Sequence, residues 1–355
     1  MIKSCYIHIP FCKNICSYCD FCKMYYNKDF IDKYLLSLEK EINLYYKNDL
    51  LNTLYIGGGT PSCLDEISLK KLFKIISIFK LNKTYEFTFE CNIEDINEKL
   101  LIFLKENKVN RISIGLQSFN KKYIEFMNRK YLNKKEITDK INLVKKYFNN
   151  INIDLIYGIN NETLKELQEE VDSFINLDVN HISLYSLILE DNTILKTKKY
   201  KEIDDDLNRK MYDYIRKTLK KNNYIHYEIS NFSKKGYMSK HNLCYWNNDN
   251  YYGFGLGSSG FIDNIRYTNT RSINKYLDND YLYDKEIIDK RLDMSYFMIL
   301  GLRKIKGVSE LDFYKRYNTK IRDVFNVDNL SYKDGYYYID EDKLFIENSI
   351  LVDFV

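Results

Sequence analysis

Six short apolar runs with strand character recur in the first half of the chain, and a segment with helical spacing follows each of them. The runs span residues 4–9, 52–57, 85–90, 111–116, 151–158 and 181–187. In the first helical segment, Phe30, Tyr34, Leu38 and Ile42 recur on one stripe. This alternation predicts an α/β fold with a parallel sheet. Six units are two fewer than a closed eightfold barrel needs, so we expect a partial, open β/α barrel of about six units.

The pattern changes after residue 195, which predicts a division of the chain. We expect the partial barrel with its site in residues 1–195, a connecting region in 196–280 and a small, mainly helical C-terminal domain in 281–355. The last region contains the helical segments "DMSYFMILGLRK" and "SELDFYKRY", and a hairpin is expected within "GYYYIDEDKLFI".

The composition is that of a globular protein and excludes some classes of function. The chain has 355 residues, 45% hydrophobic and 29% charged, with a net charge of +4. This small excess of positive charge does not indicate a nucleic-acid partner. The sequence has no apolar run long enough to span a membrane and begins without the pattern of a signal peptide, so we expect a cytoplasmic location. Peripheral membrane contact stays open, as does the choice between monomer and dimer.

Polar features follow the predicted strands at their carboxyl ends. A cysteine-rich loop follows the first strand and "GGGTP" follows the second, while Glu90 ends the third and Gln117 ends the fourth. Asp154 lies within the fifth. Parallel α/β folds place their sites at this edge, so the features are expected to converge on one rim.

The loop after the first strand holds four of the eight cysteines of the chain. Clustered cysteines in a cytosolic chain are more typical of a metal site than of disulfide bonds. Cys12, Cys16 and Cys19 are spaced C-x3-C-x2-C, and three such thiolates can bind three irons of a [4Fe–4S] cube, leaving the fourth iron open. The alternative is a structural zinc site with Cys22 or His8 as fourth ligand. The isolated cysteines are expected to be small buried hydrophobes: Cys5, Cys63, Cys91 and Cys244.

The stretch "YIHIPFCKNICSYCDF" resembles the cluster loop of the radical S-adenosylmethionine (SAM) superfamily, in particular its coproporphyrinogen III oxidase-like branch. The resemblance continues, in the same order, through "LYIGGGTPS", "RISIGLQSFN", "IDLIYGIN", "SLYSLILED", "HYEISNFS" and "HNLCYW". It implies a [4Fe–4S] cluster and SAM as cofactors, with Cys12, Cys16 and Cys19 as the cluster ligands.

The resemblance also implies a set of SAM contacts: Tyr6, Gly58, Gly59, Thr60, Glu90, Gln117, Arg129 and Asp154. The residue types suit the ligand, because Arg129 can donate to the SAM carboxylate and Glu90 or Asp154 can accept from the ribose hydroxyls. Each residue taken alone is equally well explained by a helix cap or a surface ion pair.

That branch contains oxygen-independent coproporphyrinogen III oxidases and heme chaperones. The oxidases carry a further cysteine two residues after the third cluster cysteine, where this chain has Phe21, and a segment before the cluster motif, which here begins near residue 1. Cys22 stands one residue later and also departs from the pattern of the chaperones.

"HNLCYW" at 241–246 matches the HNxxYW signature of the heme chaperones. The resemblance therefore implies heme as a third cofactor, with His241 as an iron contact and Tyr245 and Trp246 against the macrocycle. The alternative for His241 is a structural histidine with its hydrogen bonds satisfied.

We therefore expect a heme chaperone that binds heme, a [4Fe–4S] cluster and SAM and transfers heme to apo-hemoproteins such as respiratory cytochromes. The second interpretation is a coproporphyrinogen III oxidase, an enzyme that uses radical SAM chemistry for oxidative decarboxylation. Whether SAM is cleaved is left open by the sequence, because the cofactors supply the reactivity in either case. A zinc-stabilised binding module is the third and least favoured interpretation.

Overall fold

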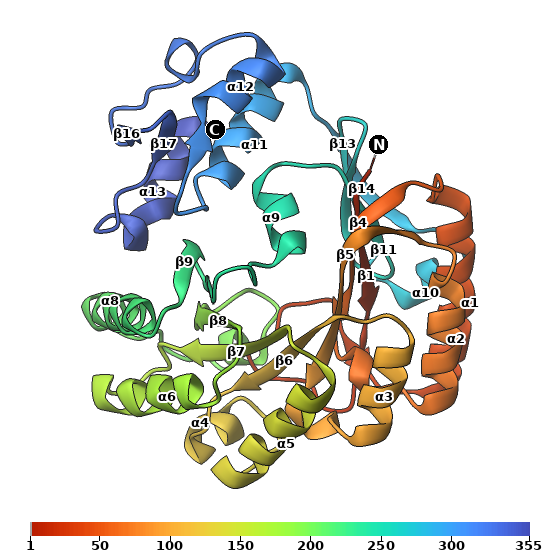
Figure 1. Cartoon of the computed structure of the whole chain (residues 1–355). Helices are drawn as coiled ribbons and strands as arrows, with labels where there is room; N and C mark the ends of the chain where they lie inside the picture. Colours follow the sequence, from red (N-terminus) through yellow and green to blue (C-terminus); the bar gives the residue numbers. More distant parts are fainter. Residues whose placement is uncertain (1) are drawn as a thin grey trace.

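Six parallel strands form the central part of the fold in the computed structural model, which describes residues 2–355 (Figure 1). They are β1 (Ser4–Ile9), β4 (Leu50–Gly58), β5 (Lys80–Asn92), β6 (Arg111–Gln117), β7 (Ile151–Tyr157) and β8 (His181–Ser186). Each pairs in parallel with the next, in chain order. The sheet curves without closing, which confirms the expected partial barrel of about six units.

Helices cover the convex face of this sheet (Figure 1). They are α1 (Lys28–Tyr45), α2 (Glu66–Ile76), α3 (Glu98–Glu106), α4 (Lys121–Phe126), α5 (Lys134–Tyr147), α6 (Leu164–Asn176) and α8 (Asp205–Lys221). On α1, Tyr34, Leu38 and Ile42 are buried, as the helical stripe predicts, and Phe30 packs half-buried against the core. α5 and α6 both begin with a capping box, so local sequence fixes where these helices start.

Further strands extend the sheet at both ends, so that within residues 2–355 it has twelve. Beside β8 lie β10 (Asn231–Ser233) and β9 (Ile225–Glu228). Beside β1 lie β11 (Tyr251–Phe254), β12 (Ser259–Ile262), β13 (Ile265–Asn269) and β14 (Leu282–Ile287). The connecting region expected at 196–280 therefore contributes strands to the same sheet as the barrel.

The C-terminal residues form a small unit of helices and a three-stranded sheet. Its elements are α11 (Lys290–Gly301), β15 (Val308–Ser309), α12 (Glu310–Tyr317), β16 (Ser331–Lys333), β17 (Tyr336–Tyr338) and α13 (Glu347–Leu351). The hairpin lies earlier than expected, because its turn is made by Asp334 and Gly335, which both have positive φ.

The helix α9 (Lys240–Trp246) lies between the barrel and this C-terminal unit (Figure 1). The C-terminal unit is joined to the barrel by backbone hydrogen bonds from Ile229 N to Arg303 O (3.1 Å) and from Ile305 N to Tyr227 O (3.1 Å). Within residues 2–355, none of the helices has the length and apolar character required to cross a bilayer.

Candidate functional site

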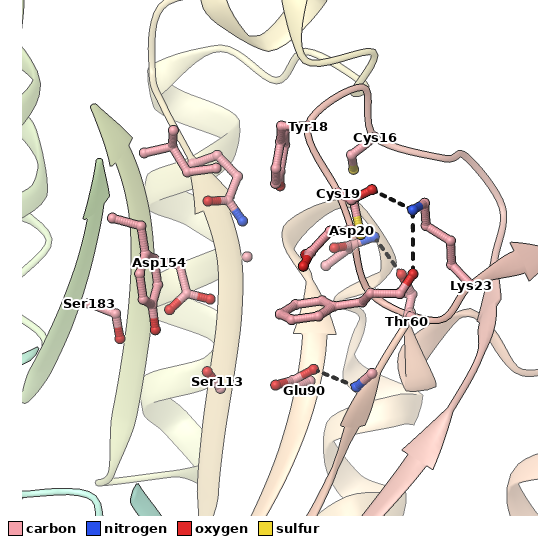
Figure 2. Close-up of a pocket in the computed structure, with 18 of the residues that line it drawn as sticks. Cys16, Tyr18, Cys19, Asp20, Lys23, Thr60, Glu90, Ser113, Asp154 and Ser183 are labelled. Carbon is pink, nitrogen blue, oxygen red and sulfur yellow. Dashed lines mark hydrogen bonds between the residues drawn. The ribbon is translucent and has the colours of Figure 1, made fainter. Parts of the chain in front are cut away.

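A cavity of ≈ 340 Å³ opens at the carboxyl ends of the barrel strands (Figure 2). It brings together most of the residues that the sequence singles out, from six separate segments of the chain. The following predicted residues line it: Cys12, Cys16, Cys19, Gly58, Gly59, Thr60, Glu90, Gln117, Arg129 and Asp154. Two predicted residues do not line it, Tyr6 and His241.

The cysteine loop is closed at its base and tied to neighbouring loops. The short strands β2 (Phe11–Cys12) and β3 (Met24–Tyr25) pair in parallel and hold its two ends together. Ser17 N donates to Met127 O (3.1 Å), and Leu195 N donates to Ser17 O (3.1 Å). These bonds from distant segments fix the loop over the cavity.

The three spaced cysteines face the cavity, whereas the fourth does not. Cys12 Sγ accepts from Thr60 Oγ1 at 3.6 Å, and Cys16 Sγ lies 3.7 Å from Arg129 Nη1. Burial raises the pKa of the Cys12 thiol and raises that of Cys19 to about 11. Metal binding at these thiols must therefore displace protons.

A [4Fe–4S] cube and a single zinc ion place different demands on the three thiols. Zinc would bring its sulfur ligands within about 4 Å of one another, since each Zn–S bond is short. Among residues 2–355, no three His, Cys, Asp or Glu side chains converge closely enough to share one metal ion. A cube needs no such convergence, because each thiolate binds a different iron.

The two side chains weighed as a fourth zinc ligand both point elsewhere. His8 Nε2 lies 2.7 Å from Cys22 O, and its Nδ1 lies 3.0 Å from Tyr6 OH. Because a carbonyl only accepts, Nε2 carries the proton and Tyr6 donates to Nδ1. The buried Cys22 sulfur packs against Gly257, where a Cβ would lie 2.9 Å from it. His8 and Tyr6 therefore support the base of the loop from β1.

The isolated cysteines are buried as expected. They are Cys5, Cys63, Cys91 and Cys244, and none of the eight cysteines forms a disulfide.

The glycine loop after β4 lets backbone approach the cysteine loop closely. A Cβ on Gly59 would lie 2.9 Å from Cys12 Sγ, and Gly58 has a φ of +115°. Gly59 N donates to Ile9 O (2.8 Å), and Thr60 N donates to Phe11 O (2.9 Å). Larger residues would clash with the loop, so glycine here is a requirement of close packing.

Glu90 is held from both sides on the cavity wall. Tyr55 OH donates to its Oε1 at 2.6 Å, and Gly58 N donates to its Oε2 at 3.0 Å. Burial raises the pKa of this carboxyl to about 7, although the two donors oppose the shift. Asp154 lies across the cavity on β7, and burial raises its pKa as well (Figure 2).

Gln117 and Arg129 complete the rim. Gln117 ends β6 with a φ of 71°, and its buried Oε1 has no hydrogen-bond partner. A buried acceptor left without a partner is costly, so it is a natural contact for a bound ligand. Arg129 Nη2 donates to Gly115 O (2.9 Å) and forms an ion pair with Glu94 (3.5 Å).

Several residues that line the cavity were not predicted from the sequence: Tyr18, Tyr55, Asn92, Arg111, Asn152 and Asn242. A signal for three of them exists in strand alternation, since side chains two residues apart share a face. Asn92 follows Glu90 by two, Asn152 precedes Asp154 by two, and Arg111 lies on the same face of β6 as Gln117.

His241 occupies a different place from the one that its motif suggests. It is 1% exposed, with Nδ1 2.8 Å from Thr53 Oγ1 and Nε2 2.7 Å from Tyr245 OH. Its backbone N donates to Glu86 on β5 (3.1 Å). Both ring nitrogens are occupied, so iron ligation through either of them would require breaking a buried hydrogen bond. The structure thus fits the structural alternative for His241, and its contact with heme iron stays a prediction.

Trp246, the last residue of the motif, does reach an open cavity. This second cavity, of ≈ 450 Å³, lies between α9 and the C-terminal unit. Phe297 and Tyr336 supply apolar lining, and Lys304 and Lys306 supply positive charge.

Comparisons with known proteins agree with this arrangement. The model of the Radical SAM superfamily matches residues 6–174. The chain is 38% identical to the heme chaperone HemW of Lactococcus lactis subsp. lactis (strain IL1403), over 94% of this chain and 91% of that protein. It is 37% identical to the heme chaperone HemW of Bacillus subtilis (strain 168), over 91% and 89%.

The fold is similar to that of the coproporphyrinogen III oxidase HemN from Escherichia coli, described as a radical SAM enzyme. The TM-score is 0.86, with 19% identity, over 99% of this chain and 90% of that one. At this identity the likeness supports the fold alone.

Proposed function

Because this chain belongs to the radical SAM superfamily and, within it, to the HemW family of heme chaperones, we propose that it binds heme and transfers it to apo-hemoproteins. The observation that carries the proposal is the extent of the similarity to HemW. It spans nine-tenths of the chain and so extends well beyond residues 6–174, which the superfamily model matches. Respiratory cytochromes are the acceptors that we favour.

Cys12, Cys16 and Cys19 are our proposed ligands of the [4Fe–4S] cluster that the family implies. Their exposure to one cavity supports this assignment. When bound, the cluster and SAM supply redox and radical chemistry. The chain itself orients SAM and excludes water.

For SAM we propose contacts with the cavity wall. The unpartnered Oε1 of Gln117 and the carboxylates of Glu90 and Asp154 are acceptors for hydroxyl and ammonium groups, and Arg129 is a donor for the carboxylate. We propose that Tyr6 acts indirectly, through His8.

The oxidase is the weaker interpretation. Phe21 stands where the oxidases carry a further cysteine, and this residue is 62% exposed on the rim of the cavity.

We further propose a cytoplasmic location. We also propose that the chain divides at about residues 195 and 280, and the change in sequence pattern supports this division.

The decisive experiment is anaerobic reconstitution with iron and sulfide, followed by heme titration and a parallel assay for decarboxylation of coproporphyrinogen III. Trp246 is the single tryptophan, so quenching of its fluorescence gives an unambiguous titration signal. We expect saturable heme binding, transfer to an apo-cytochrome and no decarboxylation. SAM-dependent decarboxylation without heme uptake would overturn the proposal in favour of the oxidase.

A further inference from the structure

Arg111 is a buried cation inside the barrel and is not among the proposed contacts of the cofactors. It begins β6, its side chain is 2% exposed, and it lines the cavity together with Glu90 and Asp154. In the strand register it lies opposite Thr88 of β5. A group of this size and charge so deep in a barrel requires a physical reason.

Arg111 forms no ion pair with any residue in the described range 2–355. The arginines that pair with carboxylates in residues 2–355 are Arg129, Arg216, Arg303, Arg316 and Arg322. The Arg111 Nε has no hydrogen-bond partner, and neither has the buried Oγ1 of Thr88. A buried charge without a close partner is unfavourable by several kcal/mol, so its field must be compensated by other charges in the cavity.

The compensating charges lie on the two strands that flank β6. Glu90 on β5 is paired in register with Ser113, and Asp154 on β7 is paired with Gly115, so both stand on either side of the strand that carries Arg111. Both carboxylates are half-buried on the wall of the cavity. Burial raises the pKa of each, and Arg111 acts in the opposite direction on both.

We propose that Arg111 is a positioning residue for SAM, whose positive charge favours the ionised forms of Glu90 and Asp154, which accept hydrogen bonds from the cofactor. This rests on the proposed SAM site. An ionised carboxylate offers acceptors at both oxygens, whereas a protonated one must donate at one of them. Arg111 would thus act on the cofactor through two other side chains.

The groups that face Glu90 determine the direction in which its pKa moves when Arg111 is removed. Tyr55 OH and Gly58 N donate to it and favour the charged form, while Asp154 disfavours it. Asp154 in turn receives a hydrogen bond from Asn152 (2.9 Å). With Glu90 already near pKa 7, removing Arg111 moves its pKa upward, so that the carboxyl is mostly protonated at neutral pH.

The test compares SAM affinity from about pH 6 to about pH 9 in the anaerobically reconstituted protein, for wild type, Arg111→Met and Arg111→Lys. In Arg111→Met, the pH midpoint of binding should move up by about one unit, with about fivefold weaker binding at pH 7 that recovers at pH 9. Arg111→Lys should restore most of the wild-type profile. Titration of the SAM amino group is common to all samples and cancels in the comparison.

Arg216→Met is the matched control, because Arg216 is also a buried arginine but is paired with Asp213 and lies outside the cavity. It should lower the melting temperature without moving the SAM midpoint. An equal loss of SAM affinity at every pH in Arg111→Met would overturn the proposal, since a structural role gives that result.

Two further measurements separate the possible failures. If Arg111→Met does not fold, Arg111→Gln removes the charge while keeping a polar group beside Thr88. If both neutral variants stay unfolded at pH 9 with SAM present, Arg111 is structural and the proposal falls. Wild-type protein that binds heme but no SAM would instead refute the SAM site itself.

Discussion

Arg129 donates a hydrogen bond to Asn92, with 3.0 Å between Nη2 and Oδ1. Asn92 in turn donates a hydrogen bond from its Nδ2 to Thr60 Oγ1 at 3.2 Å. Thr60 contacts the Cys12 sulfur, and Arg129 contacts that of Cys16. On this part of the rim, one hydrogen-bonded chain therefore joins two proposed SAM contacts, Thr60 and Arg129, to two proposed cluster ligands.

Arg129→Ala should weaken SAM binding by about 1.5–3 kcal/mol, the range for a charge-assisted hydrogen bond. This corresponds to roughly a ten- to hundredfold higher Kd. Calorimetric titration of SAM into the reconstituted variant measures it. Arg216→Ala serves as control, because it removes a buried arginine outside the cavity. Unchanged SAM affinity together with a large fall in melting temperature would favour a structural role for Arg129.

Cys22→Ser should retain about four irons per chain after anaerobic reconstitution, the content of one [4Fe–4S] cluster. The physical reason is that the Cys22 sulfur packs against Gly257 outside the cavity. Cys19→Ser is the matched variant within the same loop and should lose the cluster. Iron analysis and the visible absorption spectrum report both results. Loss of the cluster in Cys22→Ser alone would reverse the assignment.

The raised pKa of Glu347, in the C-terminal unit, predicts how the free energy of unfolding depends on pH. Its side chain is 4% exposed and lies 3.2 Å from Arg303 Nη1, and burial raises its pKa to about 7. The unfolded carboxyl titrates near about 4.3. The folded state thus keeps this proton up to a higher pH than the unfolded state does. The stabilisation that results is complete below about pH 4 and is lost as the pH rises through about 7.

Glu347→Gln should therefore reduce the fall in stability between about pH 5 and pH 8, by on the order of 2 kcal/mol. Denaturant unfolding at several pH values measures this slope. The control is Glu341→Gln, since Glu341 is 61% exposed in its ion pair with Arg216 and should leave the slope unchanged. An identical slope in Glu347→Gln and wild type would contradict the shifted pKa.

The sequence predicted the barrel and most of its rim because both depend on local patterns. Strand alternation and helical stripes repeat every few residues, and Glu90 and Gln117 end recognisable strands. Asn92 and Arg111 were missed because strand alternation indicates only that they share a face with Glu90 and Gln117, and not whether that face lines a closed cavity or meets solvent. That depends on how the whole sheet curves.

His241 shows a second limit of sequence analysis, because a matching motif does not reveal which distant residues its side chain contacts. Its motif resembles that of the heme chaperones, and a histidine beside aromatic residues suits heme iron. Its partner Thr53, however, is 188 residues away in sequence. Only the folded chain shows that the helix α9 docks against β4 and β5, at Thr53 and Glu86.

His241→Ala decides between a structural histidine and an iron ligand. Because both ring nitrogens are hydrogen-bonded and the residue is buried, we expect a loss of stability of about 2–4 kcal/mol from the unpaired Thr53 and Tyr245 hydroxyls and the void left behind. The Soret band of the heme complex should keep its wavelength, because the iron ligands are unchanged. Tyr245→Phe is the control, since it removes one of the two bonds without leaving a void, and should lower the melting temperature less. A shifted Soret band and faster loss of heme in His241→Ala, at a melting temperature close to that of wild type, would instead establish His241 as an axial ligand.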